Sequence, residues 1–535
     1  MSMFSVGLSG LSAAQNALNT TSNNISNVFT PGYNRELTQL GEGRTGGGVR
    51  VDSIERQFNT YVANQLNSAK TQSSALDTYN NQISQIDNLL ADRAAGLSPL
   101  MQNFFSSLED LASAPSDPAA RQGVLGTANT LSAQFRSFDG YLQDMQSNIN
   151  NQIKDEVTQI NNTVEQIAGL NKEIALARAR SGEAPNGLLN QRDHLVSELN
   201  ERMDLRLNVQ DGKTYNISLP NGQPLVTGTN SFKLETMQAD YDPQRTVVGY
   251  RDGGGNLTQL NESTIKGGAL GGLMSFRSET LDKTQNQIGQ LAVSLSVAFN
   301  EQHKKGIDLN GDNGEDFFNV RAPQAYSYAG NSADVASIEF DADNLGQLRA
   351  TDYIVSYRDD TFTVTRNDNG ASVDFEWSND TLSFGGVDIA FTNMPANGDK
   401  FEIQPVRRAG NGMEVNISDV DQIAAGEEAS SGDNRNALAL QNLQSENIVG
   451  GNASVSGAYA SIVSDVGNRA NITQVNLDAR QGLTDQLRAV QQSESGVNLD
   501  EEAANLLRYQ QYYMANARVI DTAGSIMDTI LNLRN

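Results

Sequence analysis

The two ends of this chain carry the same seven-residue apolar repeat, and the middle of the chain matches neither end. The repeated positions are Phe4, Leu11, Leu18 and Ile25 near the N-terminus and Leu499, Leu506, Tyr513, Ile520 and Met527 near the C-terminus. A sustained repeat of this kind predicts a helix that buries one stripe against another helix. Two such helices can pair as a coiled coil only if the chain folds back on itself. We therefore expect a long molecule with both termini at one end, and we expect these nine side chains to form its assembly interface.

The N-terminal helix is also unusual in its charge. Residues 1–34 contain no charged side chain, and Arg35 is the first. The face away from the repeat is polar or small, as at Ala13, Ala14 and Ala17, so it can pack on a neighbour without desolvating an ion. The alternative is a disordered tail, since terminal segments often fray. Because isolated helices of this length are marginal in water, we expect this helix to be ordered in an assembly and poorly ordered in the free chain.

The chain as a whole is long and strongly acidic. Its 535 residues can form several cores, and 38 Lys and Arg against 64 Asp and Glu give a net charge of −26. That charge argues against nucleic acid and against anionic membrane surfaces as partners. No segment approaches the roughly 18 apolar residues of a membrane helix, so membrane insertion is not expected. The N-terminus lacks the pattern of a cleavable signal peptide, and export would need another route. The absence of cysteine excludes disulfides, thiolate metal sites and cysteine nucleophiles.

Helical and extended patterns alternate in blocks along the chain. They predict a mainly α fold with inserted β structure, in which an elongated multidomain chain has paired terminal helices, a discontinuous helical-bundle body and a small all-β outer domain. The expected domains are 1–54 plus 497–535 (the terminal coiled coil), 55–322 plus 408–496 (the helical body, with a β element near 205–262) and 323–407 (the inserted β domain). The sequence leaves open whether the two β regions pack together.

The strongest helical pattern in the middle of the chain covers residues 120–180, as one helix or a helix pair. Asp117 or Ser116 can cap its start. Asn171 falls on its apolar stripe, where a buried polar residue can fix the register of a helix pair. The alternative is that the helix is simply ending near Gly182.

Two further local signals concern turns and caps. Alternation at residues 361–365 and 373–377, around Asn-Asp-Asn-Gly at 367–370, predicts a β-hairpin. Asn498 and Glu501 have the spacing of a capping box at the start of the last helix. The acidic residues 500–502 suit the positive end of that helix.

Residues that could carry chemistry are few. Neither histidine, His194 or His303, has metalloprotease spacing, and His303 at a helix end suits a role as a helix-dipole partner. Asp308, Asn310 and Asp312 weakly resemble the first ligands of a calcium loop, but the following positions lack its glycine and its bidentate glutamate. A polar turn is the stronger interpretation. We find no catalytic constellation, and we expect neither enzymatic activity nor a cofactor.

Five segments resemble a known protein family. Residues 21–33, Thr-Ser-Asn-Asn-Ile-Ser-Asn-Val-Phe-Thr-Pro-Gly-Tyr, look like the N-terminal signature of bacterial flagellar rod, hook and hook-associated axial proteins, with Ser26 in place of the common alanine. Residues 497–513 are similar to the closing helix of that family. Three internal stretches narrow the resemblance to the hook-associated protein 1 group of junction proteins: Asn-Gly-Leu-Leu-Asn-Gln-Arg-Asp at 186–193, Gly-Ala-Leu-Gly-Gly-Leu-Met-Ser-Phe-Arg at 268–277 and Gly-Asp-Asn-Arg-Asn-Ala-Leu at 432–438.

The resemblance implies an extracellular structural adaptor of the flagellum, placed at the hook–filament junction and exported through the flagellar type III channel. The implied partners are the hook protein, the second hook-associated junction protein, copies of the same chain in a ring, and an export chaperone that binds the C-terminal helix. Two other functions remain open for the inserted β domain, which could carry a secreted hydrolase or an adhesin. The absence of histidine from residues 323–407 weighs against most hydrolase designs.

Overall fold

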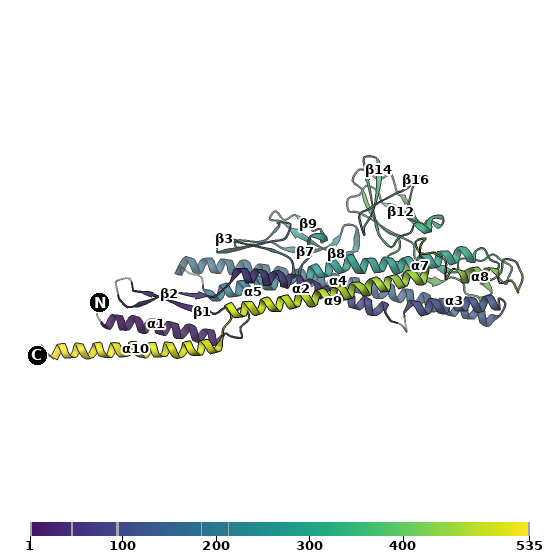
Figure 1. The fold of residues 1–535 in the computed structure, drawn as a ribbon. Coiled ribbons are helices and arrows are strands. Elements are labelled where there is room, and N and C mark those ends of the chain that lie inside the picture. The colour runs from purple at the N-terminus through teal and green to yellow at the C-terminus, as the bar shows by residue number, and fades with distance from the viewer. Residues whose placement is uncertain (1–2, 44–46, 93–95, 183–184, 212, 533–535) are drawn as a thin grey trace.

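The computed structural model describes residues 3–43, 47–92, 96–182, 185–211 and 213–532. The molecule is elongated, and the chain runs out along it and returns, so that both termini lie at the same end, as predicted (Figure 1). That end consists of helix α1 (Met3–Ser26), helix α10 (Leu499–Asn532) and an antiparallel hairpin of strands β1 (Glu36–Glu42) and β2 (Val49–Arg56). Within the described residues, no helix is both long and apolar enough to span a membrane.

Long helices form the body of the molecule. They are α2 (Thr60–Leu90), α3 (Leu97–Ser113), α4 (Pro118–Ser181), α5 (Asn186–Arg202), α6 (Gly268–Phe276), α7 (Asp282–His303), α8 (Arg435–Asn442) and α9 (Val455–Ser495). A π-helical turn, Arg277–Leu281, joins α6 to α7. The predicted apolar stripes of these helices meet in one large core, which includes Ile83, Phe104, Leu131, Phe135, Ile160, Leu291 and Phe299.

Helix α4 is a single helix rather than a helix pair. It has 64 residues and is about 96 Å long. The Asp117 carboxylate caps its start by accepting the Ala119 N–H at 3.0 Å, and Pro118 occupies the first turn, where a missing N–H costs nothing. Gly182, with a φ of 82°, ends it in the left-handed conformation that glycine adopts freely.

Close helix packing explains the glycine-rich segment 268–277. A Cβ atom added to Gly272 of α6 would lie 2.4 Å from the carbonyl oxygen of Ala75 on α2. The two helices therefore approach each other at a distance that no larger residue allows.

Antiparallel sheets cover the middle of the body. One contains β3 (Arg206–Gln210), β4 (Thr214–Ser218), β5 (Pro224–Thr227) and β6 (Asn230–Ser231), and the next contains β7 (Leu234–Ala239), β8 (Asp242–Arg251) and β9 (Leu257–Gln259). Asn171 of α4 binds the first of them, because its buried side chain donates to the carbonyl oxygens of Tyr215 and Gly228, each at 2.8 Å. Asn171 thus fixes a helix to a sheet, and its side-chain oxygen also accepts from Arg192 of α5 at 3.1 Å. Its expected role in setting the register of a helix pair stays a prediction.

The chain enters and leaves the outer β region side by side, through β10 (Phe318–Asn319) paired with β20 (Glu414–Val415). Between them lie two antiparallel sheets. The first has the order β11 (Gln324–Ser327), β19 (Lys400–Gln404), β13 (Tyr353–Arg358), β14 (Thr361–Arg366), β15 (Ser372–Val373), and the second has the order β12 (Val335–Phe340), β18 (Val387–Phe391), β17 (Thr381–Phe384), β16 (Glu376–Ser378). They enclose an apolar core of their own, which includes Val355, Val364, Leu382, Ile389 and Phe401.

The predicted hairpin in this region is half right. Strands β14 and β15 pair across the turn that contains Gly370. Residues 373–377 are not one strand, however, because β15 ends at Val373 and Trp377 belongs to β16 in the other sheet. Simple alternation cannot reveal that a chain changes sheets, since both strands present one face to the shared core.

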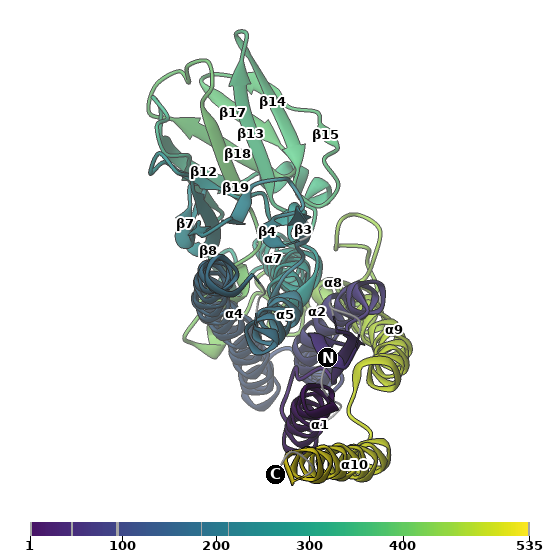
Figure 2. The same ribbon diagram turned by 90° about the vertical axis from the view of Figure 1, so that its left-hand side faces the viewer.

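The two β regions do pack together. The Tyr241 and Tyr328 rings stack with centroids 5.5 Å apart, and the side-chain amide of Gln404 donates to Asp242 at 3.3 Å. The outer β region projects from one side of the elongated helical body, beside the sheets of the body (Figures 1 and 2).

Candidate assembly interface

Helices α1 and α10 lie side by side and antiparallel at the end of the molecule that holds both termini (Figure 1). Gly7 faces Ile520, Gly10 faces Asn516, and Asn24 hydrogen-bonds Glu502, which fixes the direction of the pair. The β1–β2 hairpin packs on another side of α1. Helix α10 is exposed over most of its surface, and Glu502 is the residue that it buries within the described chain.

Small residues form the buried stripe of α1. The buried positions are Gly7, Gly10, Ala13, Ala14, Ala17, Thr20, Thr21 and Asn24. A Cβ atom added to Gly10 would lie 2.1 Å from Asn516 Oδ1, and one added to Gly7 would lie 2.7 Å from Ile520 Cγ1. The absence of side chains at these positions therefore lets α10 approach closely.

Of the nine residues of the predicted interface, Ile520 faces Gly7 in this seam. Five of the nine side chains are half-buried: Leu11, Leu18, Ile25, Leu506 and Ile520. Phe4, Leu499, Tyr513 and Met527 are between 36% and 56% exposed. The fully buried positions of α1 are thus small residues, and the expected pairing of the nine large side chains across the helices stays a prediction. The role of the nine side chains in contacts between copies stays a prediction.

A buried polar node joins α1, the hairpin and α10 at the base of the pair. The Asn24 amide donates to the carbonyl oxygen of Glu36 at 2.9 Å and to Glu502 Oε2 at 3.2 Å, and its oxygen accepts the Tyr33 hydroxyl at 2.8 Å and the Glu36 N–H at 2.9 Å. Arg35 binds Glu502 through Nε at 2.7 Å. Burial, with Glu36 and Glu502 nearby, raises the pKa of Tyr33, so its hydroxyl stays a donor.

Glu501 binds the same arginine as Glu502. It lies 2.7 Å from Arg35 Nη1 and is 58% exposed, whereas the Glu502 side chain is 1% exposed. Asn498 caps α10 as predicted, by accepting the N–H of Asp500 at 3.0 Å. The Glu501 carboxylate points to Arg35, which corrects the expected capping box at this helix start.

A second series of hydrogen bonds and ion pairs links the node to the body. The Asn34 amide donates to Asn190 Oδ1 at 2.8 Å, and Arg56 donates to the same oxygen at 3.1 Å. Arg56 also pairs with Asp193 at 2.6 Å, and Asp193 accepts the Tyr215 hydroxyl at 2.6 Å. The segment 186–193 therefore anchors the terminal region to helix α5 and to the first sheet.

Sequence reasoning missed the node, although the signals were present. Asn24 lies inside the segment 21–33, and Arg35 is the first charged residue of the chain. Glu502 reads as a helix-dipole partner because three acidic residues share the first turn of α10. Only the fold brings positions 24, 35 and 502 together.

Two other predicted residues have structural roles. His303 is fully buried; its Nδ1 lies 2.7 Å from the Glu315 carbonyl oxygen, and its Nε2 accepts the Ala424 N–H at 2.9 Å. Burial lowers its pKa, so it is a neutral bridge between loops, and its expected role as a charged helix-dipole partner is wrong. His194 is a partly exposed residue on α5.

The calcium-like loop is a polar turn in this structure. Asp308 Oδ1 accepts the backbone N–H groups of Asn310 and Asp312 at 2.8 and 2.9 Å. Among the described residues, no group of three or more His, Cys, Asp or Glu side chains is placed to hold a metal ion.

Exposed apolar side chains gather along the outer faces of the long C-terminal helices. On α10 they include Leu507, Met514, Ile526, Met527, Ile530 and Leu531, and on α9 they are Ile472, Val475, Leu483 and Val490. The α9 residues follow helical spacing on a face other than the one that buries Ile462, Val466 and Leu477. Contiguous exposed apolar rows of this kind mark interaction surfaces.

Known protein families match this architecture segment by segment. Residues 4–34 match "Flagella basal body rod protein", and residues 491–533 match "Flagellar basal body rod FlgEFG protein C-terminal". Residues 83–318 match "Flagellar hook-associated protein FlgK helical domain", and residues 326–405 match "Flagellar hook-associated protein 1, D2-like domain".

Full-length relatives decide the family. The flagellar hook-associated protein 1 of Escherichia coli (strain K12) is 43% identical over 546 residues, covering 100% of both chains. This chain belongs to the flagellar hook-associated protein 1 family. Another member, from Salmonella typhimurium (strain LT2), is 41% identical over 551 residues, again covering 100% of both chains. The solved structure of the flagellar hook junction protein FlgK from Burkholderia pseudomallei superposes with a TM-score of 0.75 at 27% identity, covering 80% of this chain and 100% of that one.

Membership in the hook-associated protein 1 family confirms the resemblance drawn from the five sequence segments. It makes this chain a structural component of the bacterial flagellum, with a part in motility and flagellum assembly. The mainly α fold with inserted β structure is likewise confirmed.

Proposed function

We propose that this chain is the structural adaptor between hook and filament, and that it polymerises through its terminal helices without catalysing a reaction. The observation that carries the proposal is the exposure of α10, which buries Glu502 within the described chain and leaves its apolar side chains in solvent. Burying those side chains against other copies would stabilise an assembly by about 25 cal/mol per Å² of apolar surface.

Helix α9 supplies a second surface for self-association. Its row of Ile472, Val475, Leu483 and Val490 continues from the body toward the start of α10. A neighbouring copy in a ring would cover this row while α1 and α10 form the inner layer. The nine heptad residues, from Phe4 to Met527, are the proposed contacts of that layer.

The wider context follows from family membership. We infer an extracellular location at the hook–filament junction, with the hook protein on one side and the second hook-associated junction protein on the other. Export would use the flagellar type III channel, with a chaperone on the C-terminal helix before secretion. The proposed domains are 1–54 plus 497–535, 55–322 plus 408–496, and 323–407, and the separate apolar core of the outer β region supports the last of them.

Removing residues 499–535 tests the proposal. The body should keep its cooperative unfolding transition, because its core lies between residues 79 and 466, and the truncated protein should fail to enter flagella. In a deletion strain complemented with it, electron microscopy should show hooks without filaments, with flagellin shed into the medium. Truncated protein found at hook tips would overturn the proposed role of α10.

A further inference from the structure

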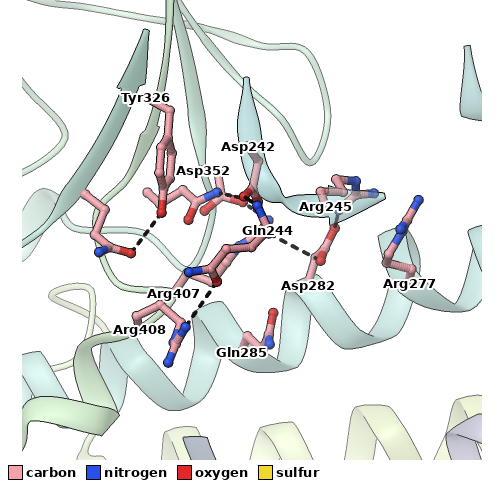
Figure 3. Close-up of polar contacts among 12 residues, drawn as sticks. Asp242, Gln244, Arg245, Arg277, Asp282, Gln285, Tyr326, Asp352, Arg407 and Arg408 are labelled. Atoms are coloured by element: carbon pink, nitrogen blue, oxygen red, sulfur yellow. Dashed lines mark hydrogen bonds and ion pairs between the residues drawn. The ribbon is translucent and has the colours of Figure 1, made fainter. Parts of the chain in front are cut away.

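Buried ion pairs hold the outer β region on the body. Arg407 and Asp352 come from the outer region, and Asp242, Arg245 and Asp282 come from the body (Figure 3). Arg407 pairs directly with Asp352 and lies 3.4 Å from Asp282 and 3.9 Å from Asp242. The contact between the two parts therefore depends on charge balance in a site that excludes most water.

The body side of this contact is built by the π-helical turn. The turn brings Arg277 and Asp282, five positions apart, into one cluster. Arg245 binds Asp282 at 2.7 Å and Glu262 at 2.8 Å, and Arg277 binds Glu262 at 2.6 Å. Such π-helical turns are rare and are frequently found at functional sites.

The cluster contains more carboxylates than guanidinium groups. The three cations are Arg245, Arg277 and Arg407, and the five carboxyl groups are Asp242, Glu262, Asp282, Asp352 and Glu402. Glu402 is 3% exposed. Within the described part of the chain the structure gives its carboxyl group no hydrogen bond and no ion pair. If ionised, it would be a nearly buried charge with no cation bonded to it, and only the edge of the cleft would hydrate it, which is costly.

The surroundings of Glu402 come from several elements. It lies on β19, opposite Tyr326 of β11 and Ile354 of β13. The charged groups that face it are Asp352 before β13, Arg407 after β19, and Asp242 and Arg245 of β8. Tyr241 and Tyr328 lie beside it, and with Lys283 and Arg469 they line a cleft of about 1090 Å³ between the outer region and the body.

We propose that Glu402 is a proton-operated latch, which lets the outer β region sit firmly on the body when protonated and loosens that contact when ionised. Burial, and then the negative charge of Asp352, raises the pKa of Glu402 to about 8 against the opposing effect of Arg407 and Arg245. Glu402 lines the open cleft, which offers its ionised carboxylate a route to water, and a tilt of the outer region would widen that route.

The sign of the effect follows from linkage. The pKa of Glu402 is higher in the folded protein than in the unfolded chain, where it is 4.5. The stabilising contribution of its protonation is complete below pH 4.5 and is lost as the pH rises to about 8. Above that value Glu402 is ionised in the folded protein as well, and the latch is open.

The absence of cysteine allows a direct test on the full chain. Cysteines placed at the exposed positions Asn148 of α4 and Ser378 of β16, labelled with a fluorophore pair, report the distance between body and outer region. We expect a narrow distance distribution at about pH 6.5 and a broader or shifted one at about pH 9.5, with a midpoint near the pKa of Glu402.

Glu402→Gln, which mimics the protonated acid, should keep the narrow distribution at both pH values. Glu376→Gln, at an exposed carboxyl group of the same region, should behave as the wild type. A wild-type distribution that does not change with pH, or one that broadens equally in the Glu402→Gln variant, would overturn the latch. An unchanged wild-type distribution overturns the latch even if Glu402→Gln folds poorly.

Discussion

Asn24 shows how one side chain can organise the end of a molecule. Its amide group makes contacts with α10, the hairpin and the Tyr33 turn at once. All of these partners are at least half-buried, so a missing partner leaves a polar group without water. Glu502, which accepts from both Asn24 and Arg35, is the partner on which the attachment of α10 most depends.

Glu502→Gln should loosen the terminal pair. Loss of the charged partner of Arg35 should cost about 1–3 kcal/mol locally, and hydrogen exchange in α1 should quicken about tenfold for each 1.4 kcal/mol. Glu501→Gln is the matched control, because it removes the exposed partner of the same arginine, and such pairs contribute about 0–1 kcal/mol. Equal effects of the two substitutions would refute the special role of Glu502.

His303 should make the stability of the body sensitive to acid. Its Nε2 accepts the N–H of Ala424, so protonation of Nε2 would place one N–H donor directly opposite another. Because burial holds its folded pKa below the ordinary histidine value of 6.5, the stability it provides is complete above pH 6.5 and is lost as the pH falls through the folded pKa. Thermal unfolding measured from neutral to acid pH should show this loss as a falling melting temperature. The His303→Gln variant should be less stable at neutral pH, and its stability should depend less on pH. The His194→Gln variant should keep the pH dependence of the wild type.

At the scale of elements, the sequence predicted the terminal helices and not their contacts. The seven-residue repeat identifies a helix correctly, because apolar periodicity reports that a face is to be buried. It does not say whether the burial happens within the chain or between copies. The sequence predicted that Ala13, Ala14 and Ala17 lie on an outer face that packs on neighbouring molecules. In the structure these residues are buried within the chain. Small side chains contribute little to a pattern of apolar residues, so a helix contact made of small residues cannot be recognised from that pattern.

Replacing Gly7 and Gly10 by leucine should separate α1 from α10. Even a Cβ atom at these positions meets Ile520 and Asn516 at less than van der Waals distance, so longer side chains must push the helices apart. We expect faster hydrogen exchange in both helices, an unchanged melting transition of the body and poor incorporation into flagella. Gly123→Ala is the control, since a Cβ there meets nothing within 4 Å and should stabilise α4 by roughly 0.5–1 kcal/mol. Unchanged exchange in the double variant would show that the seam is not needed.

At the scale of the whole molecule, the order of parts was predictable and their placement was not. The switch from helical to alternating patterns located the inserted β region, and the end-to-end repeat predicted the folded-back shape. The contact between the two β regions depends on scattered residues such as Asp242, Gln404 and Arg407. No pattern along the sequence connects these positions, because the packing of separate folded parts is decided by surfaces that only the fold creates.

The distribution of charge over the molecule predicts a response to salt. A net charge of −26 makes copies repel one another, while residues 1–34, which would meet in an assembly, carry no charge. The screening length falls from about 30 Å in roughly 0.01 M salt to about 10 Å in roughly 0.1 M salt. Light scattering should therefore show stronger self-association of the purified chain as salt is added, and the form lacking residues 499–535 should not respond. Weaker association at higher salt would indicate that ion pairs, rather than apolar contacts, join the copies.

The hydrogen bond between Asn24 and Glu502 joins positions 478 residues apart, and this separation sets an order of events in time. A ribosome makes α1 first and α10 last, so α1 must wait for nearly the entire chain before its partner exists. The intervening core needs neither helix and can form earlier, since contacts between distant positions are the slowest to be made. The region proposed to meet other subunits is thus the last to take shape, which leaves it open to capture by whatever binds it first.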